Sequence, residues 1–150
     1  MIIAIDPGPV QSAMVWWDGK EILRHEILSN EKLLDFLRGI DTGMVVIEMV
    51  ASYGMPVGKS IFETVLFIGR CLEAAKVRTE LVYRGEIKDH FCKSRRAKDS
   101  NIRQTLIDRF GEPGKKKSLY RGIVRQAAFL EESAKGRGEG SRRHGMSRKW

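Results

Sequence analysis

The sequence has little that would direct it to a membrane, a disulfide framework or a zinc site. No apolar run approaches the roughly 18 residues of a membrane-spanning helix. The N-terminus carries no basic leader, so we expect no signal peptide. Cys71 and Cys92 are the only cysteines and form no CxxC pair, and the three histidines are scattered without the spacing of zinc ligands. We interpret both cysteines as buried free thiols in a reducing compartment.

Charge is present in quantity but is unevenly placed. The 150 residues include 27 Lys and Arg against 19 Asp and Glu, a net charge of +8. Residues 1–114 hold 16 residues of each sign, whereas residues 115–150 hold 11 basic and 3 acidic residues and so carry the entire excess. A neutral body with a basic tail is typical of proteins that bind nucleic acid, although a merely solubilising tail has the same composition. The length suits one domain with a hydrophobic core.

Two short apolar runs that each end on a carboxylate organise the chain. Residues 1–5 form a continuous apolar run that ends on Asp6, and Pro7 and Gly8 then turn the chain. Residues 43–48 repeat this design and end on Glu48. Such runs are typical of central strands buried on both faces. The ends of these strands are where open α/β sheets usually place ligand sites.

The two carboxylates predict a metal site if their strands are parallel neighbours. In that arrangement Asp6 and Glu48 would face each other at one sheet edge and repel. A divalent cation removes this repulsion, and Mg²⁺ typically takes one or two carboxylates together with waters and substrate phosphates. The pair would then form half of a phosphoryl-transfer metal site. A strand-end aspartate serves about equally often as a turn residue.

Local patterns predict the remaining elements. The pair Asp18-Gly19 is a hairpin signal between strands at 12–17 and 21–28. Ser60 is the expected cap of a helix to about residue 76 whose apolar residues cover more than one side, which suggests a subunit partner. The other elements expected are helices at 31–38, 99–110 and 123–134, a strand at 80–83, a helical turn at 85–91 and a disordered segment from 136 onward.

Four stretches resemble a known family. Ile5-Asp6-Pro7-Gly8, Val46-Ile47-Glu48 and residues 51–58 and 97–111 are similar to the phage branch of RuvC-like Holliday junction resolvases, over about residues 1–120. The resemblance implies an RNase H-like α/β fold, with a mixed sheet whose strands 1–3 are antiparallel and which is flanked by helices. It also implies a nuclease domain at 1–120, followed by an atypical basic tail at 121–150. A homodimer that cleaves branched DNA with Mg²⁺ or Mn²⁺, in the cytoplasm of a bacterium or a phage-infected host, is implied as well.

The resemblance also assigns candidate site residues. Asp6 and Glu48 correspond to the first two catalytic acids that bind metal. The basic residues expected to contact DNA phosphates are Lys59, Lys93, Arg95, Arg96 and Lys98. Tyr53, in the loop after Glu48, is expected to stack on an unpaired base. Solvated surface charge and loop packing are the alternative interpretations of the basic residues and of the tyrosine.

The chain departs from the family after residue 120. Resolvases of this type carry their remaining acids on a last apolar helix, and here the best available acids, Glu131 and Glu132, match poorly in spacing and surroundings. We therefore expect weak or absent cleavage. A branched-DNA-binding protein with a degenerate site, or an RNA nuclease of the same fold, are alternatives. An actin-like ATPase would need a duplicated domain, for which the chain is too short.

Overall fold

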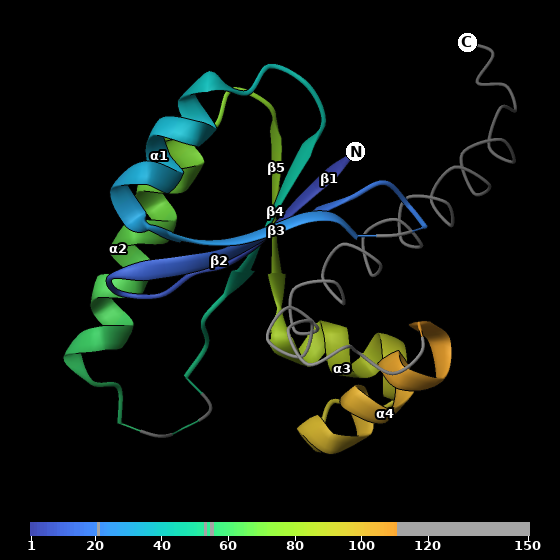
Figure 1. Ribbon diagram of the computed structural model, residues 1–150. Coiled ribbons are helices and arrows are strands. Elements are labelled where there is room, and N and C mark those ends of the chain that lie inside the picture. Colours follow the sequence, from blue (N-terminus) through green and yellow to red (C-terminus); the bar gives the residue numbers. More distant parts are fainter. Residues whose placement is uncertain (21, 53, 55, 111–150) are drawn as a thin grey trace, which may run out of the picture.

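A five-stranded mixed sheet forms the centre of the molecule (Figure 1). The computed structural model describes residues 1–20, 22–52, 54 and 56–110. The elements in chain order are β1 (Ile2–Asp6), β2 (Gln11–Trp17), β3 (Ile22–Ser29), α1 (Asn30–Gly39), β4 (Met44–Met49), α2 (Lys59–Ala74), β5 (Arg78–Tyr83), α3 (Arg84–Cys92) and α4 (Asp99–Phe110). The sheet order is β3-β2-β1-β4-β5, with the first three strands antiparallel and β1, β4 and β5 parallel. This confirms the predicted α/β class and the RNase H-like mixed sheet.

The two apolar runs become the central strands because their residues are buried on both faces. Ile3, Ala4 and Ile5 of β1 are fully buried, and so are the three residues of β4 that pair with them, Val45, Val46 and Ile47. Alternate residues of a strand point to opposite faces. A run of this kind therefore needs a packed layer on each side of the sheet, and the helices supply those layers.

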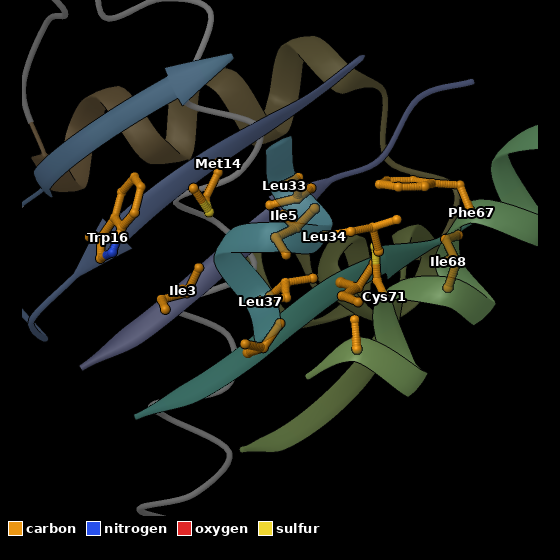
Figure 2. Close-up of a cluster of buried hydrophobic side chains, with 13 residues drawn as sticks. Ile3, Ile5, Met14, Trp16, Leu33, Leu34, Leu37, Phe67, Ile68 and Cys71 are labelled. Atoms are coloured by element: carbon orange, nitrogen blue, oxygen red, sulfur yellow. The ribbon is translucent and has the colours of Figure 1, made fainter. Parts of the chain in front are cut away.

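Helices α1 and α2 cover one face, and α3 and α4 lie on the other side of the sheet (Figure 1). Figure 2 shows the core of the first layer, where leucines of α1 and the residues Phe67, Ile68 and Cys71 of α2 meet the sheet residues. Leu33, Leu34 and Leu37 of α1 have the helical spacing that places them on one face, and each is at most 2% exposed. The second layer contains Ile87 of α3, which packs on Val46 and Val82.

The β2–β3 hairpin forms as the sequence predicts. Gly19 has a positive φ of 108°, and the Asp18 carboxylate accepts a hydrogen bond of 2.8 Å from the Lys20 N–H. Trp16 joins the core under α1 and α2, whereas Trp17 packs with Ala4 and Val15 on the opposite face. Both tryptophans are thus buried, on opposite sides of the sheet.

Some predicted boundaries are corrected. Gly58, not Ser60, is the N-cap of α2, and its carbonyl accepts a 3.0 Å hydrogen bond from the Ile61 N–H. The helix starts earlier than expected. The backbone at Gly58 is still extended (φ −87°, ψ 171°), as is usual for an N-cap, and the first helical turn begins at the next residue, Lys59. Cys71 is buried, but Cys92 is only half-buried because it ends α3.

Several predictions fall beyond the described residues. They concern the end of the nuclease domain at 120, the tail at 121–150, the helix at 123–134 and disorder from 136 onward. Within the described part of the chain, no helix combines the length and the apolar character needed to cross a membrane.

Candidate active site

Asp6 and Glu48 occupy neighbouring positions on adjacent parallel strands. The register pairs Ile5 of β1 with Ile47 of β4, so Asp6 and Glu48 are the next residue of each strand. β1 ends at Asp6, and β4 continues by one residue beyond Glu48. The structure therefore brings both predicted acids to the same edge of the sheet, the one formed by the carboxyl ends of its parallel strands.

Both acids also belong to the same face of the sheet. Ala4 and Val46 are register partners, and each precedes one of the acids by two residues. Because side chains alternate along a strand, Asp6 and Glu48 lie on the face of Ala4 and Val46. This is the face that packs against α3 and is opposite to α1 and α2. The Asp6 side chain is exposed, whereas Glu48 is only 8% exposed.

The turn after Asp6 is fixed by a hydrogen-bond network that sequence reasoning missed. The Ser12 hydroxyl accepts a 3.2 Å hydrogen bond from the Gly8 N–H and donates one of 2.8 Å to Asn30 Oδ1. Asn30 Nδ2 in turn donates to the Gly8 carbonyl at 2.9 Å. A Cβ atom on Gly8 would lie 2.5 Å from the Gln11 carbonyl oxygen, so the turn requires glycine. The only sequence signal was that Asn30 stands at a helix start, where an amide is common.

Glu48 has a cationic neighbour that the sequence did not reveal. β5 lies beside β4 with Val82 opposite Glu48, and Arg84 follows β5 as the first residue of α3. Arg84 Nη1 lies 3.5 Å from Glu48 Oε1. This ion pair places a permanent positive charge next to the more buried of the two acids. A basic residue just past a strand is too common a pattern to predict such a contact.

The predicted phosphate contacts fall in two places. Lys93, Arg95, Arg96 and Lys98 are all exposed on the connection between α3 and α4. Lys93 adopts a left-handed backbone (φ 54°), and the Ala97 N–H donates to the Ser94 carbonyl at 3.1 Å, which forms a tight turn. Lys59 stands apart as the first residue of α2, where it forms an exposed ion pair with Glu63 at 3.5 Å.

The basic connection borders two shallow depressions. Lys93 and Arg95 line one of about 550 Å³ together with Glu86, Asp89 and His90 of α3. Arg96 and Lys98 line another of about 470 Å³ together with Cys92, Ser94, Ala97 and Asn101. Four of the predicted basic residues are thus gathered on one surface next to α3. Tyr53 lies outside the described residues.

The donor set suits one hard cation. Two carboxylates on adjacent strand ends match the one or two that Mg²⁺ takes while it keeps several of its waters. Within the described ranges, no group of three or more His, Cys, Asp and Glu side chains could hold a metal ion. Glu131 and Glu132, the best available but poorly matched candidates for a further ligand, lie outside these ranges.

Comparison with known proteins identifies the fold. No family model and no curated protein matches the sequence. Among solved structures, RuvC of Thermus thermophilus superposes with a TM-score of 0.67 at 15% identity, covering 89% of this chain and 95% of that one. RuvC of T. thermophilus in complex with Holliday junction substrate gives a TM-score of 0.66, also at 15% identity, with 89% and 93% covered. The chain therefore has the RuvC-like fold.

Proposed function

We propose that this protein is a metal-dependent endonuclease that resolves Holliday junctions or other branched DNA. The observation that carries the proposal is the placement of Asp6 and Glu48 on adjacent parallel strands, on one face of a RuvC-like sheet. The T. thermophilus RuvC structure with Holliday junction substrate supports the choice of DNA. The proposal places the protein in the cytoplasm of a bacterium or of a phage-infected host, in recombination or phage DNA processing.

Each predicted residue takes a role in this proposal. Asp6 and Glu48 hold Mg²⁺ or Mn²⁺, which when bound activates water and stabilises the charge that develops on the scissile phosphate. The Gly8, Ser12 and Asn30 network holds the turn that follows Asp6. The basic residues bind backbone phosphates, which positions DNA without reading its sequence. These basic residues are Lys59, Lys93, Arg95, Arg96 and Lys98. Tyr53 has a different role and stacks on an unpaired base of the junction.

A homodimer formed through α2 completes the proposal. α2 buries Thr64, Phe67, Ile68, Cys71 and Ala74 but leaves a second set of apolar side chains at the surface. Leu66 is 71% exposed and Phe62 58%, and Leu66 borders a groove of about 710 Å³ that reaches Val10 at the β1–β2 turn. A two-fold axis through this surface would give two equivalent active sites for the two strands that a resolvase cuts.

The second candidate is a branched-DNA-binding protein that does not cleave. The observation in its favour is that the described residues supply only two carboxylates to the site. One Mg²⁺ could still bind, but a second ion held in register would need a further ligand. We therefore expect binding and cleavage to separate in this chain, with cleavage weak.

The deciding experiment compares binding with cleavage on a four-way junction of fixed position and on a linear duplex of equal length. Binding is measured in EDTA, and cleavage with Mg²⁺ and with Mn²⁺. We expect tighter binding to the junction, with affinity falling steeply as salt rises. Equal affinity for junction and duplex would refute the resolvase proposal.

Two variants connect the result to the site. Glu48→Gln should abolish any metal-dependent cleavage and keep junction binding in EDTA. Glu80→Gln is the matched control, because Glu80 lies in the middle of the neighbouring strand β5, opposite Val46, where it forms an ion pair with Arg78. Cleavage by the Glu48→Gln variant at the wild-type rate would show that this carboxylate is not part of an active centre. Wild-type cleavage at about 1 per second or faster would instead refute the non-cleaving candidate.

A further inference from the structure

The open side of α2 carries two opposite charges on either side of its most exposed leucine. Glu63, Leu66 and Arg70 all line the groove of about 710 Å³ between α2 and the β1–β2 turn. They are three and four residues apart, so they lie on one face of the helix. Leu66 is 71% exposed, and the Glu63 side chain is 44% exposed. This face therefore presents an acid, an apolar centre and a base, in that order along the helix.

Both charges are available to a partner without the loss of an existing contact. Glu63 pairs with Lys59 at 3.5 Å, but the Lys59 side chain is 88% exposed, so this surface ion pair contributes little. A carboxylate has two oxygens and can accept a second cation while it keeps the first. Arg70 is exposed and forms no ion pair with the residues that the structure describes.

The order of the charges selects one arrangement of two copies. In a two-fold dimer with parallel α2 helices, each residue meets its own copy, so Glu63 would face the partner's Glu63 and Arg70 the partner's Arg70. In an antiparallel dimer with the axis between Leu66 and Phe67, Glu63 faces the partner's Arg70, and this pair occurs twice. Because like charges repel and opposite charges attract, the charges favour the antiparallel dimer.

The contact would extend from α2 to the turn that follows Asp6. Val10 of this turn is 77% exposed and lines the same groove as Leu66 and Arg70, so a helix laid across the groove covers all three. Packed helices usually cross at an angle, which confines their contact to a few turns around the crossing point. Glu73 lies about 10 Å along α2 from the axis and is therefore outside the contact.

We propose that a second copy of this chain lays its α2 antiparallel across this groove, with reciprocal ion pairs between Glu63 and the partner's Arg70. The inference rests on the proposed function, which places self-association at α2. It adds the direction and register of the two helices and the residues that select them. Leu66 supplies buried apolar area, whereas the two charges exclude other orientations of the partner.

Two charge reversals test this register by sedimentation equilibrium of the full chain. Glu63→Arg leaves two positive charges on the face of each copy and Arg70→Glu leaves two negative ones. Each variant alone should therefore self-associate about tenfold more weakly than the wild type. An equimolar mixture of the two should recover the wild-type affinity, because every pair then joins opposite charges. The double variant should recover it as well.

Glu73→Arg is the matched control, because it changes the net charge as much as Glu63→Arg does but lies outside the contact. It should leave self-association unchanged. Glu63, Arg70 and Glu73 are all exposed, so circular dichroism should show the wild-type fold for every variant.

The outcomes separate this inference from the proposed function. Weak self-association of both single variants, with recovery in the mixture and in the double variant, supports the antiparallel register. If the single variants weaken but neither the mixture nor the double variant recovers, or if Glu73→Arg weakens equally, the register is refuted. If the single variants associate like the wild type while Leu66→Glu does not, the ion pairs are refuted and the dimer through α2 stands. A wild-type protein that is monomeric at micromolar concentration refutes both the register and the dimer, while junction binding and cleavage are decided by their own assays.

Discussion

Replacing Asn30 with alanine tests whether the turn after Asp6 depends on the network that joins it to α1. The substitution removes the acceptor of the Ser12 hydroxyl, at 2.8 Å, and the donor to the Gly8 carbonyl, at 2.9 Å. Each hydrogen bond contributes about 1 kcal/mol, and Ser12, at 2% exposure, cannot replace its lost partner with water. We expect the free energy of unfolding to fall by about 2–3 kcal/mol.

The assay is urea denaturation of the wild type and four variants, followed by tryptophan fluorescence, since Trp16 and Trp17 are both buried. Ser12→Ala should cost a similar amount, and the double variant should cost about 1 kcal/mol less than the sum, because both single variants delete the same hydrogen bond. Lys32→Ala is the control, from an exposed position on α1, and should change stability by less than about 0.5 kcal/mol.

The same variant tests the connection between the network and the site. Loosening the turn that follows Asp6 should lower Mn²⁺ affinity, by up to about tenfold, as for other residues that support a metal ligand. If Asn30→Ala behaved like Lys32→Ala in both stability and Mn²⁺ affinity, the network would not position Asp6. A loss of stability with unchanged Mn²⁺ affinity would leave it a structural role only.

The remaining predictions concern the dimer, the thiols and the core. Leu66→Glu should weaken self-association by at least about tenfold in sedimentation equilibrium, because burial of a leucine is worth about 1.5–3 kcal/mol. Glu73→Gln, elsewhere on the exposed surface of α2, should leave self-association unchanged. A wild-type protein that is monomeric at micromolar concentration would exclude the dimer. Burial raises the pKa of the Cys71 thiol from its usual 9.0 to about 12, so at pH 8 iodoacetamide should modify the half-buried Cys92 alone, and alkylation of native Cys71 would contradict this. The stability that Cys71 contributes is complete below about pH 9 and should be lost as the pH rises toward 12, because the unfolded thiol ionises first. Leu37→Ala should lower the free energy of unfolding by about 3–4 kcal/mol, since Leu37 is fully buried between α1 and the sheet, and a loss below about 1 kcal/mol would show that the site collapses around the smaller side chain.

The sequence by itself determined which segments form strands and helices, and which sides of them are buried. The runs before Asp6 and Glu48 are apolar without alternation, and such runs are stable only as central strands covered on both faces. The leucine spacing of α1 and the Asp18-Gly19 turn have equally local causes. Burial patterns of this kind repeat every two or every 3.6 residues, so they can be read without knowledge of the partner surface.

The tertiary structure decided which side chains meet. Arg84 reaches Glu48 because β5 pairs with β4 in a register that sets Val82 opposite Glu48. Asn30 reaches the turn after Asp6 because β2 and β3 return the chain to the start of α1. Each contact joins residues far apart in the sequence, 36 positions for Arg84 and Glu48 and 22 for Asn30 and Gly8. No periodic pattern in the sequence predicts such pairings, because they depend on strand order and register. The packing of the whole sheet selects both.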